Sequence, residues 1–283
     1  MSRELPSFDL VVATTGRSDE LGRFLDSVEG QAFEHVRVIV VDQNDDERVT
    51  PVLRDRSLNV THVRTERGLS RARNVGLGLV DADLVAFPDD DCVYPDGLLA
   101  RVAGRFHSDR ELDGLAGRAA DAEGRSSASW KTDRARLTDD NLWNRANAAT
   151  IFLRRDLVTQ IGDFDERLGL GSEEPWSSGE ETDYLIRAVR AGARVEYDPD
   201  IVVGHDVRPD DALVGRRDGA SVGYLLRKHR YPPQVLGRMF VRPVGGIAKA
   251  LVDRDLPRAR YYLASVRGRI RGYIGASRSK SSP

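Results

Sequence analysis

Short apolar runs alternate with amphipathic stretches between residues 8 and 205. The apolar runs are typical of buried strands in a parallel sheet. Between the first two of them, Leu21, Phe24, Leu25 and Val28 recur at helical spacing. Alternating strands and helices predict right-handed crossovers and a doubly wound, mostly parallel α/β sheet with helices on both faces. The predicted strands are 8–15, 36–41, 59–63, 84–87, 113–118, 148–153 and 199–205.

The strand predicted at Leu84–Phe87 is followed by three adjacent carboxylates. Pro88 cannot donate to a strand ladder, so the strand should end there. The carboxylates follow as Asp89, Asp90 and Asp91. In open α/β sheets, ligands bind at this C-terminal edge of the strands. Adjacent anions repel one another unless a cation lies between them, and a divalent cation that bridges phosphate oxygens meets this need. A solvated acidic turn is the alternative, and the triplet taken alone favours it.

The turns after the first two predicted strands bear on nucleotide binding. Residues 14–18 lack the Gly-x-Gly-x-x-Gly spacing that cradles a pyrophosphate in dinucleotide-binding folds. Asp42 ends the second strand, where its carboxylate could accept a hydrogen bond from a ribose or a base edge. A loop aspartate that caps a turn is an equally good interpretation of Asp42 alone.

From Ala212 onward the pattern becomes helical and basic. Residues 206–283 contain 17 Lys/Arg and 6 Asp/Glu, whereas the preceding residues contain 26 and 39. This asymmetry predicts one domain at residues 1–211 and a basic helical extension at residues 212–283.

Amphipathic basic helices of this kind bind anionic membrane surfaces, and we expect that role for the extension. The alternatives are that these helices cover the sheet or form a homodimer contact. A nucleic-acid partner is not expected, because no helix-turn-helix, zinc finger or aromatic-rich RNA-binding signature accompanies the basic residues. The polar end of the chain, Ser277 to Pro283, is predicted to be disordered.

The cysteine content and the N-terminus narrow the class of protein further. Cys92 is the only cysteine, which excludes internal disulfides and a cysteine-rich zinc site and agrees with a reducing compartment. Met1–Pro6 has no apolar signal-peptide core, and no run approaches the roughly 20 apolar residues of a membrane span. We therefore expect a cytoplasmic protein, either in solution or peripheral on the inner face of the cell membrane.

Four segments resemble, in order, the motifs of glycosyltransferase family 2, and the resemblance extends roughly from residue 8 to residue 205. It implies the GT-A fold and an inverting transfer of a sugar from a nucleotide-sugar donor by single displacement. The segments are Val41–Asn44, Gly68–Gly76, Phe87–Asp91 and Ser178–Arg187.

The resemblance also implies a metal site. In this family an Asp-x-Asp motif holds the metal and the donor ribose, and it corresponds to Asp89 and Asp91 here. Asp91 is assigned mainly to the metal. His205, at the end of the last predicted strand, is expected to complete the metal site or to contact the diphosphate. The expected ion is Mn²⁺ or Mg²⁺, and a neutral imidazole suits Mn²⁺ better.

The nucleotide-sugar is expected to contact side chains from several strand ends and one helix. Arg71 and Arg73 lie two apart on a predicted helix at residues 71–80 and do not share a face. One is expected to reach a phosphate and the other to pair with an acidic neighbour. Arg71 is the candidate for the phosphate, and a structural salt bridge is the alternative role for this residue. For Asp90 the alternative to nucleotide-sugar binding is a purely structural role. The predicted contacts are Thr14, Asp42, Arg71, Asn74, Asp89 and Asp90.

Glu180, Glu181 and Asp183 are predicted to open a helix. Acidic residues in a first turn oppose the helix dipole favourably, which is a complete structural explanation. The resemblance instead implies that one of these carboxylates takes a proton from the acceptor hydroxyl as general base. Glu181 stands where the family has a catalytic Asp and is one methylene longer, so Asp183 and, third, Glu180 remain alternatives.

A loop and two tryptophans give weaker indications of function. Residues 169–179 show no periodicity and predict an exposed loop, which is a candidate lid over the acceptor. Trp130 and Trp143 are the large apolar residues of a polar stretch. Packing is favoured for both over stacking on a sugar face.

Together these features predict an inverting, metal-dependent glycosyltransferase with one GT-A domain and a C-terminal helical extension. The expected donor is a nucleoside-diphosphate sugar, with a UDP-sugar as first choice. The expected acceptor is a glycan or a lipid-linked molecule in cell-surface polysaccharide or glycolipid assembly. A sugar-1-phosphate nucleotidyltransferase is one alternative, but residues 14–17 match its Gly-rich first loop poorly. A catalytically silent nucleotide-sugar-binding scaffold of the same fold is the other.

Overall fold

The computed structural model describes residues 5–126, 130–206 and 211–278. The chain divides into two compact units. The first consists of residues 1–164 and 184–207, and the second of residues 165–183 and 208–283.

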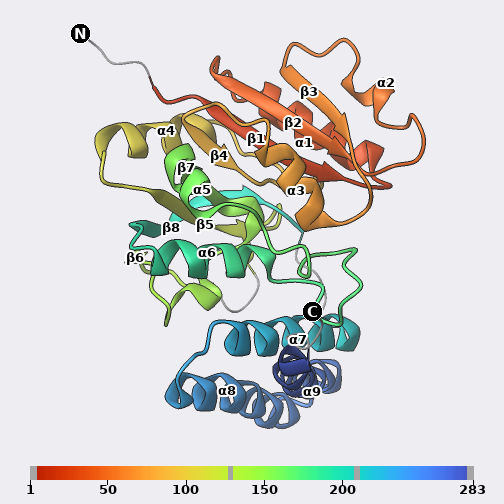
Figure 1. The fold of residues 1–283 in the computed structure, drawn as a ribbon, viewed down its shortest axis with the longest axis vertical. Helices are drawn as coiled ribbons and strands as arrows, with labels where there is room; N and C mark the ends of the chain where they lie inside the picture. The colour runs from red at the N-terminus through yellow and green to blue at the C-terminus, as the bar shows by residue number, and fades with distance from the viewer. Residues whose placement is uncertain (1–4, 127–129, 207–210, 279–283) are drawn as a thin grey trace. The chain divides into compact units, whose positions relative to one another are not determined.

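The first unit is built on a sheet that, within the described residues, has eight strands (Figure 1). The strands are β1 Phe8–Thr14, β2 Val36–Asp42, β3 Asn59–Arg64, β4 Leu84–Ala86, β5 Gly114–Ala120, β6 Ala135–Arg136, β7 Ile151–Arg154 and β8 Val195–Gly204. Their order is β3-β2-β1-β4-β7-β5-β8-β6. The first four are mutually parallel, as are β5 and β8, whereas β7 and β6 run antiparallel to their neighbours. The predicted α/β class with a mostly parallel sheet is confirmed.

Helices cover both faces of this sheet. They are α1 Ser18–Glu29, α2 Thr50–Leu53, α3 Leu69–Leu77, α4 Leu98–Ser108, α5 Arg155–Ile161 and α6 Glu180–Arg190, with 3-10 turns η1 Leu142–Asn144 and η2 Ala148–Thr150. Side chains alternate between the two faces of each strand. Leu10 and Val12 of β1 therefore share a core with α1 and α4, whereas Val11 shares the opposite core with α3, α5 and the part of α6 from Tyr184 onward.

Helix α3 approaches β1 unusually closely at Gly76. A Cβ atom at this position would overlap Cγ1 of Val11, so only glycine allows this spacing. The helix starts at Leu69 and ends at Leu77, whereas the sequence pattern predicted residues 71–80. The close packing fixes the depth at which the polar residues of α3 lie beside the strand ends.

Strand β8 is longer than predicted, because it starts at Val195 and not at Pro199. Proline cannot donate to the ladder, and the register between β5 and β8 shifts between Ala116 and Arg118 to accommodate it. The side chain of Arg118 donates to the Pro199 carbonyl at 2.9 Å. Pro199 was predicted to start the strand, but it lies inside β8, at the irregularity in the pairing with β5.

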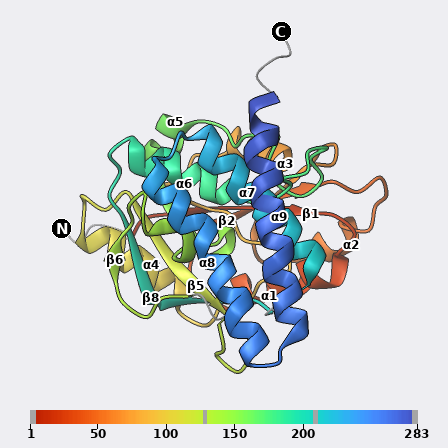
Figure 2. The ribbon, with the colours of Figure 1, turned by 90° about the horizontal axis from the view of Figure 1, so that it is seen from below.

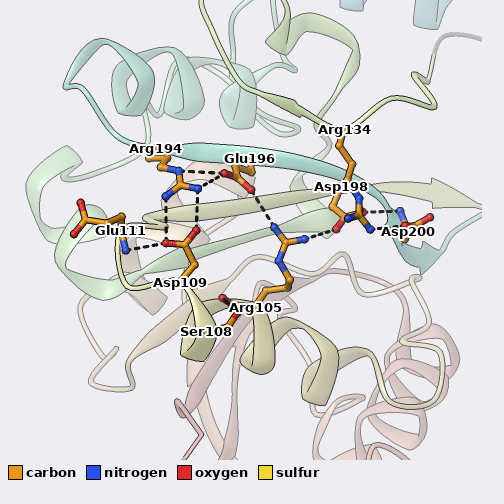
Figure 3. A network of polar contacts seen from close by, with 9 residues as sticks. All are labelled: Arg105, Ser108, Asp109, Glu111, Arg134, Arg194, Glu196, Asp198 and Asp200. Carbon is orange, nitrogen blue, oxygen red and sulfur yellow. Dashed lines mark hydrogen bonds and ion pairs between the residues drawn. The ribbon is translucent and has the colours of Figure 1, made fainter.

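A network of charged side chains holds β8 against α4 (Figure 3). Arg105 of α4 donates to Asp198 at 2.5 Å and to Glu196 at 3.0 Å. Arg134 donates to the other oxygen of Asp198 at 3.1 Å and to Asp200 at 2.6 Å. Asp198 is buried, so its charge needs these two guanidinium partners. The network fixes the strand that leads to Gly204.

The second unit contains the C-terminal helical extension, which confirms that part of the predicted fold. Its helices are α7 Ala212–Lys228, α8 Pro233–Val252 and α9 Leu256–Arg278, and α9 packs against both of the others (Figure 2). Ser277 and Arg278 are helical, contrary to the predicted disorder, and the rest of that predicted segment, residues 279–283, lies outside the described residues.

Glycines allow α7 and α9 to lie in close contact. A Cβ at Gly223 would overlap the backbone of Arg269, and one at Gly272 would overlap the backbone of Ala220. In the loop before α6, Trp176 is buried and stacks on Tyr224 of α7, with ring centroids 4.6 Å apart. The prediction of an exposed loop at residues 169–179 was therefore wrong at this residue.

Candidate functional site

Two backbone bridges hold the acidic loop that follows β4. Parallel pairing with β1 continues past the end of β4 as a bridge between Ala13 and Asp89. On the other side, Val93 and Gly204 exchange two backbone hydrogen bonds of 2.8 Å. His205 directly follows Gly204, so this antiparallel bridge brings the histidine to the acidic loop.

Asp89, Asp91 and His205 form a cluster in which one potential ligand atom from each lies within 4.8 Å of the others. His205 Nε2 is 3.3 Å from Asp91 Oδ1 and 3.8 Å from Asp89 Oδ2. Its Nδ1 donates to the Asp206 carbonyl at 2.9 Å, which directs Nε2 toward the carboxylates. The hydrogen bond with Asp91 and the two negative charges hold the pKa of His205 above its usual range, against the opposing effect of burial.

This donor set fits a divalent cation. Carboxylate oxygens suit Mg²⁺ and Mn²⁺, and the imidazole favours Mn²⁺ or another transition metal. All three side chains are partly exposed, so a ligand can reach them. The structure thus brings together the three residues that the sequence predicted as metal ligands.

Asp90 differs from its two neighbours because it is buried. Thr14 Oγ1 donates to Asp90 Oδ2 at 2.8 Å, and Arg17 Nη1 donates to Asp90 Oδ1 at 3.0 Å. Burial raises the pKa of Asp90 to about 6, although both hydrogen bonds oppose this. Thr14, predicted to contact the nucleotide-sugar, lies against this buried carboxylate.

Arg17 was not predicted as a site residue, yet it pairs with two of the three carboxylates. Its Nη1 also donates to Asp91 Oδ2 at 2.5 Å. Burial alone would lower the pKa of Arg17, but the charges of Asp90 and Asp91 raise it. A single arginine in the turn after β1 carries no motif, so only its position at a strand end could have identified it.

Asp42 is fully buried and is opposite Thr14 in the pairing of β1 with β2. Its Oδ1 accepts hydrogen bonds from the backbone and side-chain amides of Asn44 at 2.9 and 2.7 Å, and its Oδ2 is 3.2 Å from His62 Nε2. Asn44 in turn accepts from the Gly16 backbone at 2.7 Å. Asp42 therefore orders the turn that carries Arg17, and its contact with a nucleoside stays a prediction.

The polar residues of α3 have different surroundings. Arg73 is buried, with Nη2 3.4 Å from Asp89 Oδ1, and it lies over the ring of Phe164. Asn74 holds the backbone of Phe164 with one accepted bond of 2.8 Å and one donated bond of 3.1 Å. Arg71 is more exposed and pairs with Glu66 at 2.8 Å. Of the two arginines, Arg73 is therefore the one that lies beside the acidic loop.

The second acidic cluster is the first turn of α6, and residues 180–183 belong to the second unit. Asp183 is 0% exposed and accepts hydrogen bonds from Lys228 Nζ at 2.6 Å and from His229 Nε2 at 2.7 Å. Glu180 is also buried, whereas Glu181 is partly exposed. The three candidate bases thus differ in burial, and Glu181 is the one that solvent reaches most readily.

Comparison with known proteins identifies the family. A model described as glycosyl transferase family 2 matches residues 9–162, more than half of the chain. The chain belongs to glycosyl transferase family 2. A pre-mycofactocin glycosyltransferase of Mycobacterium tuberculosis is 29% identical over 216 residues, which cover 70% of this chain and 42% of that protein. The chain therefore spans less than half the length of this curated relative. The glycosyltransferase AglE of Haloferax volcanii is 22% identical over 283 residues, covering 93% of this chain and 86% of AglE.

Solved structures show the same fold. The mannosyltransferase PcManGT from Pyrobaculum calidifontis, in complex with GDP-Man and Mn²⁺, has a TM-score of 0.65 and 18% identity, covering 98% of this chain and 87% of that one. Residues 1–349 of S. aureus TarS, in complex with UDP-GlcNAc, give a TM-score of 0.57 and 17% identity, covering 92% and 91%. These neighbours confirm the predicted GT-A type of fold.

Proposed function

We propose that this protein is an inverting, metal-dependent glycosyltransferase. It transfers a sugar from a nucleoside-diphosphate sugar to an acceptor hydroxyl, with inversion at the reacting sugar carbon. The observation that carries the proposal is the cluster of Asp89, Asp91 and His205 at the C-terminal ends of the strands, with potential ligand atoms within 4.8 Å of one another. Ligands bind at this edge in open α/β sheets.

The leaving group requires stabilisation of negative charge. A Mn²⁺ or Mg²⁺ ion bound by Asp89, Asp91 and His205 supplies this as a Lewis acid for the diphosphate. The protein holds the proposed metal ligands in fixed positions. Two backbone bridges hold the acidic loop, and the Asp206 carbonyl orients the His205 ring. Arg17, with its side chain 41% exposed, adds a positive charge beside Asp91.

We assign the general base to Glu181. It takes a proton from the acceptor hydroxyl while that oxygen attacks the sugar carbon. The match to the family motif supports this role, and so does the partial exposure of the side chain. Asp183 fits a structural role better, because its buried carboxylate already accepts hydrogen bonds from Lys228 and His229.

The donor and the acceptor are proposed as classes of molecule. The structural neighbours were solved with GDP-Man and with UDP-GlcNAc, which supports a nucleoside-diphosphate sugar as donor. We take a UDP-sugar as the first donor to test. The acceptor we propose is a glycan or a lipid-linked molecule in polysaccharide or glycolipid assembly.

A screen of thermal unfolding tests the proposal. UDP, GDP and other nucleoside diphosphates are added with and without Mn²⁺, and donor turnover is then followed by release of the nucleoside diphosphate. A ligand at a hundredfold excess over its Kd stabilises the folded state by about 2.7 kcal/mol, which is a readily measured shift. Stabilisation by one nucleotide that requires both Mn²⁺ and Asp91 supports the proposal. If no nucleoside diphosphate stabilises the protein in the presence of Mn²⁺, or if binding occurs without any transfer to acceptors, the proposal is wrong.

A further inference from the structure

Helices α8 and α9 carry a strong positive charge. Neither Pro233–Val252 nor Leu256–Arg278 contains an aspartate or a glutamate. The basic residues of the two helices are Arg238, Arg242, Lys249, Arg258, Arg260, Arg267, Arg269, Arg271 and Arg278. Acidic partners for these residues come from outside the two helices, as for Lys249, which donates to Asp253 at 2.9 Å.

The same two helices also expose large apolar side chains. On α8, Val241 is 66% exposed and Val252 is 81% exposed, and Val244 and Leu251 are exposed between them. Of the thirteen large hydrophobic residues exposed in the described part of the chain, eight lie on α8 or α9. The members on α9 are Leu256, Leu263, Ile270 and Ile274. Such a concentration differs from the single exposed apolar residues that are normal on a protein surface.

Apolar and basic residues share one exposed face on each helix. On α8, exposed Arg238, Arg242 and Lys249 follow one another at intervals of one helical turn and then two, and exposed Val241 lies three residues after Arg238. On α9, exposed residues recur every three or four positions and alternate in the same manner. They are Arg260, Leu263, Arg267, Ile270, Arg271 and Ile274.

Arg269 of α9 is partly buried. Arg269 donates to the Met239 carbonyl, and its Nε has no hydrogen-bond partner among the described residues. Burial and then repulsion from Arg242 lower the pKa of Arg269 to about 10.

We propose that the exposed faces of α8 and α9 bind the surface of an anionic membrane. This goes beyond the proposed transfer reaction. The apolar residues enter the boundary between headgroups and acyl chains, and the arginines pair with lipid phosphates. Within the described residues, no helix has both the length and the apolar character to cross a bilayer, so the contact is with the surface. A second copy of the chain is a poorer occupant, because its same face would place like charges opposite each other.

Vesicle sedimentation with the full chain tests the proposal. The vesicles contain phosphatidylcholine alone or phosphatidylcholine with phosphatidylglycerol. We expect binding to the anionic vesicles that weakens as salt is raised.

The charge variant Arg242→Gln/Lys249→Gln should bind about five-fold more weakly for each charge removed. The apolar variant Val241→Ser/Leu251→Ser/Val252→Ser should bind roughly ten-fold more weakly, because less apolar area is buried. The matched control, Leu79→Ser/Arg48→Gln, changes an exposed leucine and an exposed arginine of the first unit and should bind normally.

Several outcomes overturn the proposal. Equal binding to neutral and anionic vesicles does so, as does an equal loss of binding in the control. If the chain does not bind vesicles but forms a dimer in sedimentation velocity that the same substitutions dissociate, the face is a contact between copies. Thermal unfolding of each variant checks its fold. If the apolar variant unfolds, the charge variant still decides, because its substitutions remove charge at exposed positions. Nucleotide binding is measured separately, so failure of the proposed transfer reaction would not be confused with failure of this proposal.

Discussion

The acidic loop at residues 89–91 and the acidic first turn of α6 each gather three carboxylates within a few residues, but the fold treats them differently. The loop lies at a sheet edge, where backbone bridges to β1 and to Gly204 hold it on both sides. The turn lies at a helix start, where the dipole favours acidic residues but fixes none of their side chains. In the α6 turn, the side chain of Asp183 is fixed instead by Lys228 of α7 and by His229, the residue after α7.

Both clusters nevertheless divide their carboxylates in the same way. In each cluster a buried carboxylate is held by specific partners, Asp90 by Thr14 and Arg17, and Asp183 by Lys228 and His229. In the α6 turn Glu180 is buried as well. The others include more exposed groups, such as Asp91 and Glu181. The comparison indicates that buried members of an acidic motif anchor the backbone and that exposed members are available for chemistry. Substitutions of the two kinds should therefore fail in different assays.

The largest effect is expected at the exposed member of the α6 turn. Glu181→Gln removes a general base while keeping the size of the side chain. Turnover should fall roughly 10²- to 10⁴-fold, the usual contribution of a positioned base, while nucleotide binding is unchanged. Steady-state kinetics and calorimetric titration with the nucleoside diphosphate measure the two quantities.

Two companion variants sharpen this result. Glu181→Asp restores a carboxylate that is one methylene shorter, so it should recover part of the lost turnover. Glu180→Gln changes a buried neighbour and serves as the control for altered charge in the same turn. Near-normal turnover of Glu181→Gln would contradict the assignment and leave the helix dipole as the reason for these acidic residues.

The next largest effect is expected at the exposed member of the acidic loop. Asp91→Ala removes one carboxylate of the metal cluster without disturbing the backbone bridges. Mn²⁺-dependent binding of the nucleoside diphosphate should weaken by at least roughly 100-fold, because loss of even an outer-shell partner of a metal costs 10- to 100-fold. Calorimetric titration with and without Mn²⁺ measures it. Unchanged affinity with unchanged metal dependence would remove Asp91 from the site.

Much of the acidic loop could be predicted from the sequence because its position follows from local rules. An apolar run that ends at a proline and continues as three aspartates marks a strand end, and strand ends of a parallel sheet share one edge. The partners of these aspartates are harder to predict. His205 was expected at the metal site from the family resemblance and not from a local pattern, because the antiparallel bridge between Val93 and Gly204 that brings it to Asp91 has no local signal. Arg17 is a single arginine in a turn, and its role depends on how closely the β1 turn approaches the loop.

Prediction from sequence was weaker where side chains meet across long stretches of chain. The helix that starts at Glu180 could be predicted from its acidic first turn and the spacing of its apolar residues. The pairing of Asp183 with Lys228 could not, because it depends on how α7 packs. Trp176 lies in a segment without periodicity, and it is buried against the ring of Tyr224 and beside Gly275 of α9. Periodicity reports the face of a single element and says nothing about a partner from a distant one.

A smaller effect is expected at the buried member of the α6 turn, and it should appear in stability. Asp183→Asn leaves Lys228 and His229 without the negative charge that they share. Breaking a buried ion pair by removing one partner costs about 3–5 kcal/mol, and the retained amide oxygen should keep the loss near roughly 3 kcal/mol. Denaturant unfolding measures the loss.

The control for this prediction is Asp165→Asn, which also removes a carboxylate that accepts from Lys228 but leaves Asp183 in place. It should destabilise the fold less, because Arg167, which loses its partner, is 49% exposed and can be solvated, and because the Asp183 pairing is intact. If Asp183→Asn abolishes turnover at a temperature where it is fully folded, the division between anchoring and chemical carboxylates fails at this turn.

The smallest effect is expected at Arg17, which pairs with one anchoring and one exposed carboxylate. Because the Arg17 side chain is 41% exposed, its ion pairs should contribute no more than about 1 kcal/mol to the free energy of unfolding. The guanidinium also lends positive charge to Asp91, and a metal ion must compete with it for that carboxylate. Arg17→Gln should therefore bind Mn²⁺ roughly two- to five-fold more tightly in the absence of nucleotide, which corresponds to up to about 1 kcal/mol. Titration of Mn²⁺ measures this, and Arg48→Gln, an arginine that pairs with Asp46, controls for the change in net charge. Weaker Mn²⁺ binding in Arg17→Gln than in Arg48→Gln would mean that Arg17 orders the carboxylates for the metal, and the anchoring role would then extend to the exposed member of the loop.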